Sequence, residues 1–97
     1  MLITVWTSSQ RLDEILTDAQ KAQIYSATPK NTSERVLMVK VKTDSRTIHI
    51  ENWADAAEAS SMPIADTDWM VTIKLYWLSD YSFIASDAGT EVYLLSS

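Results

Sequence analysis

The chain has 97 residues and a net charge of −5; hydrophobic residues make up 46% of it and charged residues 22%. This balance predicts one globular domain over residues 1–97 and excludes a disordered chain. Cysteine is absent, which excludes a disulfide framework, thiolate zinc sites and thiol catalysis. No stretch approaches the roughly 18 apolar residues of a membrane span, so we expect a cytoplasmic protein of a bacterial host cell.

Charge is distributed unevenly along the sequence. Residues 1–50 carry seven basic and five acidic side chains, whereas residues 51–97 carry eight acidic side chains and one lysine, Lys74. The formal charges of the two halves are therefore +2 and −7. Such a balance favours a basic partner for the acidic half, and it disfavours direct binding to nucleic-acid phosphates.

The N-terminal residues predict a strand followed by an amphipathic helix. Residues 2–6 (LITVW) are mostly β-branched or aromatic, and Thr7 with Gln10 forms a capping-box pattern. A break near Thr17, with Asp18 capping a second short helix, is an alternative to one continuous helix. Apolar residues recur at helical spacing within residues 9–25, at Leu12, Ile15, Leu16, Ala19 and Ala22.

Two strands with a short connection follow in the sequence. Residues 28–34 (TPKNTSE) have the composition of a loop. Residues 35–43 and 47–51 alternate between apolar and polar, and the three residues between them (DSR) are short enough for a hairpin turn. We therefore expect these two strands to pair with each other.

The second half predicts a short helix and then a meander of three strands. Asn52 is a candidate cap for a helix over residues 53–61 with Trp53 facing inward, and Pro63 would end it. Within residues 69–78, alternation predicts that Trp69 and Trp77 share a buried face with the aliphatic residues between them. The predicted order is β-α-β-β-α-β-β-β, an α+β domain with a mainly antiparallel sheet of five to six strands and two helices on one face.

Few residues form patterns that predict catalysis. His49 lies two positions from Thr47 and from Glu51, which favours an exposed cross-strand neighbour over a general base. The stretch with Asp66 and Asp68 lacks the further acids and the glycine of a calcium loop. A single glycine in the chain excludes a glycine-rich phosphate loop. We therefore predict no enzyme activity, no metal and no cofactor.

Basic residues offer one alternative, a nucleic-acid surface on the sheet. Lys40 and Lys42 on one strand and Lys74 with Tyr76 on another would form a small basic-aromatic patch if those strands are neighbours. Three lysines in a domain of net charge −5 are more typical of an exposed polar face.

The remaining features favour a protein-binding function. We expect an inhibitor that occupies a basic protein or ribonucleoprotein, with its carboxylates where nucleic-acid phosphates would lie. Small, acidic, cysteine-free domains of this kind resemble in type the phage-encoded anti-CRISPR and anti-restriction inhibitors, and also toxin-neutralising immunity proteins. A small phage structural or assembly protein that uses unpaired sheet edges is the alternative. The candidate partner contacts are Asp55, Glu58, Asp66, Asp68, Tyr76, Asp80, Asp87 and Glu91.

Overall fold

A computed structural model describes residues 1–27 and 34–96 of the chain. The predicted loop at residues 28–34 therefore lies, except for Glu34, outside the described residues. The elements in chain order are β1 (Leu2–Val5), β2 (Gln10–Arg11), α1 (Leu12–Ile15), α2 (Asp18–Ala27), β3 (Arg35–Val41), β4 (Thr47–Asn52), β5 (Met62–Ala65), β6 (Val71–Leu75), the short 3-10 helix η1 (Leu78–Asp80), β7 (Tyr81–Ala85) and β8 (Thr90–Ser96).

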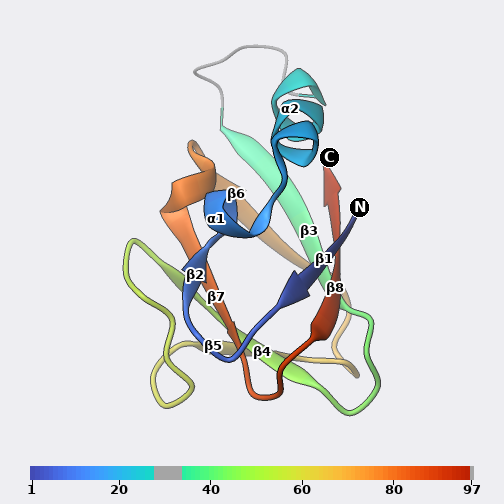
Figure 1. Cartoon of the computed structure of the whole chain (residues 1–97), viewed down its shortest axis with the longest axis vertical. Helices are drawn as coiled ribbons and strands as arrows, with labels where there is room; N and C mark the ends of the chain where they lie inside the picture. The colour runs from blue at the N-terminus through green and yellow to red at the C-terminus, as the bar shows by residue number, and fades with distance from the viewer. Residues whose placement is uncertain (28–33, 97) are drawn as a thin grey trace.

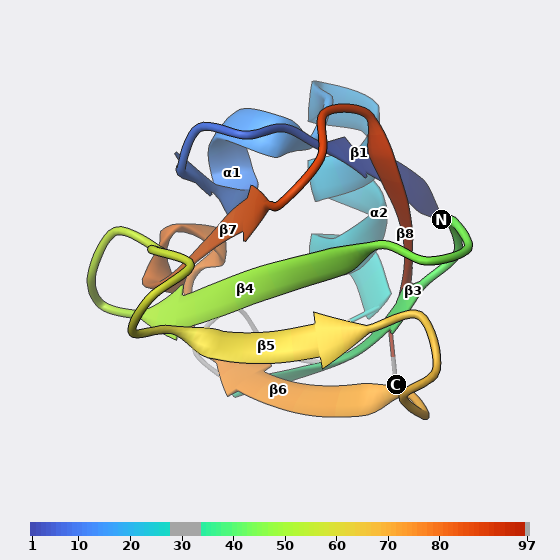
Figure 2. The same ribbon diagram turned by 90° about the horizontal axis from the view of Figure 1, so that it is seen from below.

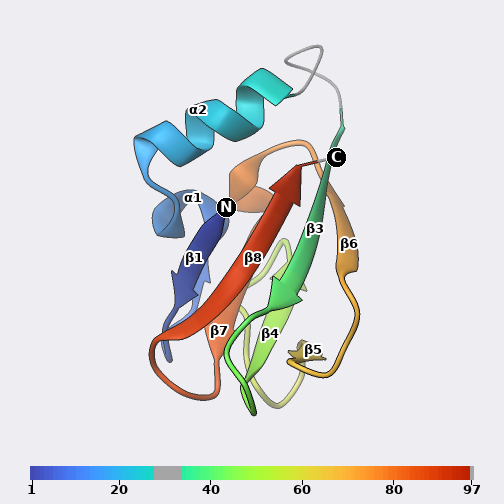
Figure 3. The ribbon, with the colours of Figure 1, turned by 90° about the vertical axis from the view of Figure 1, so that its right-hand side faces the viewer.

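The strands form two antiparallel sheets of four strands each (Figure 1). Sheet A has the order β1-β8-β3-β6, and sheet B has the order β2-β7-β4-β5. The α+β class is confirmed, but the prediction of one sheet with helices on its face is wrong. Figure 3 shows both helices toward the same end of the sheets. Two strands were not predicted, β2 and β5, and they are the two edge strands of sheet B.

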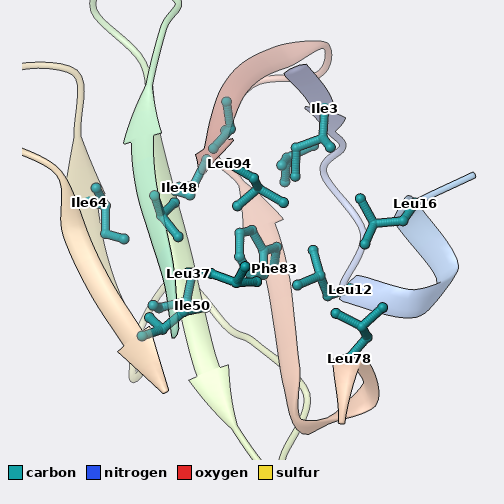
Figure 4. Packing of buried hydrophobic residues seen from close by; sticks show 14 of the residues in the cluster. Ile3, Leu12, Leu16, Leu37, Ile48, Ile50, Ile64, Leu78, Phe83 and Leu94 are labelled. Atoms are coloured by element: carbon teal, nitrogen blue, oxygen red, sulfur yellow. The ribbon is translucent and has the colours of Figure 1, made fainter. Parts of the chain in front are cut away.

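The core lies between the two sheets, and alternation along the strands explains its composition. In β3 the side chains alternate strictly between buried and half-buried, so Leu37 points inward with Val39 and Val41 beside it on the same face. From sheet B, Ile48 and Phe83 meet them and are fully buried (Figure 4). The inward faces of β3 and β4 were thus predicted correctly from the period of two.

The predicted hairpin between residues 35–43 and 47–51 is wrong. Both strands exist, but β3 pairs with β6 and β8, whereas β4 pairs with β5 and β7. Their short connection instead carries the chain from one sheet to the other, and Ser45 adopts a left-handed φ of 60° there. A short connection limits the distance between two strand ends without placing the strands in one sheet.

The N-terminal helix is divided in two, which confirms the alternative of a break near Thr17, although Thr17 and not Asp18 is the cap. Residues 16 and 17 separate α1 from α2, and Thr17 caps α2, because its hydroxyl accepts a hydrogen bond from the Gln20 N–H at 3.2 Å. The Gln20 side chain in turn accepts from the Thr17 N–H at 2.9 Å, which completes a capping box. The motif was expected at Thr7. Within residues 1–27 and 34–96, neither helix has the length and apolarity needed to cross a membrane.

The predicted helix at residues 53–61 is absent, and this segment is a loop. Trp53 has a left-handed φ of 67°, and its N–H donates to the Asp80 carbonyl at 2.8 Å. The buried Ser82 hydroxyl donates to the Ala54 carbonyl. The left-handed φ of Trp53 is incompatible with the first residue of a helix, and the Ala54 carbonyl bonds to Ser82 of β7. Pro63 lies in β5, an edge strand, where a missing N–H is tolerated.

Candidate partner-binding surface

All four tryptophans are exposed, although Trp53, Trp69 and Trp77 were predicted to face inward. The exposed fractions are 87% for Trp69, 68% for Trp53, 57% for Trp77 and 49% for Trp6. Each tryptophan lies just beyond the end of a strand, and β6 spans only Val71–Leu75. The alternation that predicted burial of Trp69 and Trp77 therefore ends before it reaches either ring. Exposed tryptophans in such number are typical of protein interfaces.

Three inter-strand turns meet at one end of the molecule, the lower end in Figure 1. The Asp66 N–H donates to the Arg46 carbonyl at 3.0 Å, and the Ser86 N–H donates to the Thr47 carbonyl at 3.1 Å. These bonds join the β3–β4, β5–β6 and β7–β8 turns. We call this region the turn end and define it by Asp44, Asp66, Asp68, Asp87 and Glu91 together with Trp6 and Trp69.

The carboxylates of the turn end are only partly neutralised. Arg46 pairs with Asp87 at 3.3 Å and Lys42 with Glu91 at 3.5 Å. Among the described residues, the carboxylates of Asp44 and Asp66 have neither an ion pair nor a hydrogen bond. Exposed ion pairs are weak, so a basic partner can compete with Arg46 and Lys42 for Asp87 and Glu91. The carboxylates of Asp44 and Asp66 need no such exchange.

Asp68 places a carboxylate directly before Trp69, the most exposed tryptophan. Its Oδ2 accepts a hydrogen bond from the Ala65 N–H at 2.8 Å, which fixes the turn before β6. Trp69 follows directly, with 87% of its surface exposed. At the same end, the ring of Trp6 lies beside Gly89, the residue with a φ of 75° in the β7–β8 turn. Local hydrogen bonds therefore hold the turns that present both rings.

Four of the eight predicted contacts lie away from the turn end. Asp55 lies in the loop after β4 and pairs with Arg11 at 3.6 Å, and Glu58 is exposed in the same loop. Asp80 is only 2% exposed, and its Oδ2 accepts the N–H groups of Tyr76 and Trp77 at 3.0 and 3.1 Å. The fold thus brings together Asp66, Asp68, Asp87 and Glu91 and leaves the others apart.

Tyr76 belongs to another surface, the outer face of sheet A. Strands β3 and β6 are neighbours, with Val36 opposite Lys74. The condition set for the basic-aromatic patch is therefore met, and its residues share this face. Two of its three lysines already have partners: the Lys40 ammonium donates to the Asp66 carbonyl, and Lys42 pairs with Glu91. Exposed apolar side chains lie on the same face; they are Leu2, Tyr93 and Leu95.

Titratable groups elsewhere do not assemble into a site. Across residues 1–27 and 34–96, no three His, Asp or Glu side chains could together hold a metal ion. His49 is half-buried, and its Nδ1 has no hydrogen-bond partner. Burial, and then the negative charge of Asp80, raise the pKa of Tyr81 above its ordinary value of 10.0. Comparisons with protein-family models, curated proteins and solved structures find no match for this chain.

Sequence reasoning missed two parts of this surface. Asp44 was assigned to the basic half of the chain, yet it joins the acidic turns of the second half because its turn adjoins theirs. The tryptophans were missed because alternation was extended past the strand ends. Asp68 just before Trp69 was the available signal, since a carboxylate in a turn ends the apolar pattern.

Proposed function

We propose that this protein is a binding module that inhibits a basic, nucleic-acid-handling protein by occupying its surface. The turn end makes the contact, with Trp69 and Trp6 as apolar anchors and the carboxylates around them. The carboxylates compete with nucleic-acid phosphates for the partner's basic side chains. A phage-encoded inhibitor of a bacterial defence system is the kind of protein that would act in this way.

The observation that carries the proposal is the 87% exposure of Trp69 beside Asp66 and Asp68. Water contact with most of an indole ring is unfavourable, because its transfer from water is worth about 2 kcal/mol or more. Interfaces recover that free energy, and tryptophan is enriched among the residues that dominate binding. Carboxylates around the anchor add fast, salt-sensitive association with a basic surface.

The experiment is capture from a bacterial lysate treated with nuclease, so that nucleic acid cannot bridge proteins. The immobilised protein is expected to retain a basic nucleic-acid-handling protein and to release it as salt increases. Trp69→Ala is expected to weaken the interaction at least about tenfold. The double variant Asp44→Lys/Asp66→Lys is expected to abolish capture, because it reverses the two unpaired carboxylates.

A matched control carries the same change of charge elsewhere. Glu34 and Glu58 are exposed and lie away from the turn end, so the double variant Glu34→Lys/Glu58→Lys should still capture the partner. Equal loss in both double variants would mean that only net charge matters, and retention in both would remove the turn end from the interaction.

A second candidate function, self-assembly, is favoured by the outer face of sheet A. Leu2 lies opposite Tyr93, and Leu95 lies opposite Met38, so apolar side chains from three strands are neighbours on an uncovered face. The test is sedimentation of the protein at up to about 0.5 mM, a range that detects weak association. Assembly that Leu95→Glu abolishes would support this function, and a monomer throughout would exclude it.

A further inference from the structure

The edges of the two sheets leave a groove on one side of the molecule. Strand β6 pairs only with β3, and β5 pairs only with β4, among the described residues. The two strands are edge strands of different sheets, and the view from below shows them one beside the other (Figure 2). A cavity of about 320 Å³ is lined by Met62 of β5, by Thr72 and Ile73 of β6, and by residues of β4 and β7. This groove is separate from the turn end, whose defining residues do not line it.

The lining of the groove matches an apolar side chain. Ile50 and Ile73, which are 2% and 3% exposed, line it together with Met62 and Tyr81. A volume of 320 Å³ is at the small end of ligand sites, which span about 300–1,000 Å³. It accommodates one or two side chains, and it is small for most cofactors.

The polar lining adds a preference for charge. Glu51 contributes a carboxylate to the groove, and no lysine, arginine or histidine lines it. The Glu51 Oε1 accepts a hydrogen bond from the Ser61 hydroxyl at 3.3 Å, which leaves its second oxygen available. A ligand that carries a cation next to its apolar group therefore complements this lining, and an acidic ligand is repelled.

Beside the groove, β6 offers more free backbone N–H groups to a partner strand than β5 does. On the side of β6 away from β3, alternate N–H and C=O groups lack a strand partner, as at any sheet edge. Strand β5 includes Pro63, which has no N–H to donate. An incoming strand therefore finds a fuller set of backbone donors on β6 than on β5.

We propose that this groove binds an extended segment of a partner protein, which pairs with the free edge of β6 and buries an apolar side chain against Ile50, Ile73 and Met62. Recognition combines backbone hydrogen bonds, which supply affinity, with a pocket, which supplies sequence preference. The preferred segment has an aliphatic residue flanked by lysine or arginine. This binding does not require the turn-end interaction.

The test uses two capped nine-residue peptides of alternating valine and threonine with a central leucine. One carries a lysine on each side of the leucine, and the other carries glutamate there. The lysine peptide, at up to about 1 mM, is expected to slow hydrogen exchange of alternate amides in Val71–Leu75. The glutamate peptide is expected to bind at least about tenfold more weakly. Absence of slowing with the lysine peptide would overturn the proposal.

Two methionines provide a matched pair of variants. Met62 lines the groove and is 47% exposed, whereas Met70 is 43% exposed and does not line it. Met62→Lys is expected to weaken binding of the lysine peptide at least about tenfold, because it replaces an apolar wall by a charge that repels the peptide's lysines, and Met70→Lys is expected to leave binding unchanged. Equal binding by both variants would overturn the proposal, provided that thermal unfolding shows both to be folded.

A second copy of this chain is the competing occupant. Protection of the β6 amides that increases with protein concentration in the absence of peptide would show self-pairing and would overturn the proposal. Failure of the turn end is distinguishable from failure of the groove, since Trp69→Ala should not change peptide binding and Met62→Lys should not change the salt dependence of capture.

Discussion

The two open sides of the sheet pair are built differently. On the side of β1 and β2, the Ala85 N–H donates to the Trp6 carbonyl at 2.8 Å and so joins β7 of sheet B to the chain that leaves β1 of sheet A. Leu12 of α1 is fully buried there and packs into the core. On the side of β5 and β6, no hydrogen bond joins the two strands among the described residues, and the groove opens. We infer that the closed side provides stability and that the open side is free to bind.

The largest expected effect is on the closed side. Leu12→Ala removes a fully buried side chain, so the free energy of unfolding should fall by about 3 kcal/mol. Urea denaturation measures it. Leu95→Ala is the control, because Leu95 is 41% exposed and should lose less than about 1 kcal/mol. Similar losses in both variants would mean that α1 does not close this side.

A smaller effect is expected at the turn that leads from β6 to β7. Asp80→Ala leaves the N–H groups of Tyr76 and Trp77 without their acceptor, which costs about 1–3 kcal/mol for each buried group. The Oδ1 of Asp80 is buried without a partner, and its removal offsets part of that cost. We expect a net loss of about 2 kcal/mol in urea denaturation, and a smaller loss for Asp80→Asn, which keeps one oxygen acceptor.

Tyr81 reports on the open side through its ionisation. Burial is the larger cause of its raised pKa, and the Asp80 charge is the smaller one. The folded state therefore holds the phenol proton more tightly than the unfolded state does. The stability from this difference is fully present below the ordinary pKa of 10.0 and is lost as pH rises through the folded value. The difference in unfolding free energy between the native protein and Tyr81→Phe, measured from pH 9 upward, should show this decline.

Local patterns predicted much of the fold. Composition and alternation together identified six of the eight strands, and alternation gave the inward faces of β3 and β4, because a half-buried strand has a period of two. Strand pairing was not predictable in this way. The same short turn at Ser45 serves a hairpin or a crossover between sheets, and only the packing of distant strands decides between them.

The candidate site was less predictable than the fold. Acidic residues in turns were identified, but hydrogen bonds between three separate turns bring Asp66 and Asp87 to the same end, and these bonds leave no trace in local sequence. The Trp53 N–H donates to the Asp80 carbonyl, a contact between residues 27 positions apart that local sequence does not reveal. Proline at position 63 was interpreted as a helix terminator, although edge strands tolerate it equally well.

The smallest expected effect tests the open side directly. Met62 and Ile64 lie on the same strand, 47% and 0% exposed, respectively. Met62→Ala should change the free energy of unfolding by less than about 0.5 kcal/mol, because its side chain already contacts water. Ile64→Ala should cost about 3 kcal/mol, since its side chain points into the core. If both variants lose the same free energy, Met62 belongs to the core and the groove is not an open side. A small loss for Met62→Ala alone would mean that β5 is anchored at Ile64, which leaves Met62, at the open end of the same face, and the edge of β6 free for a partner.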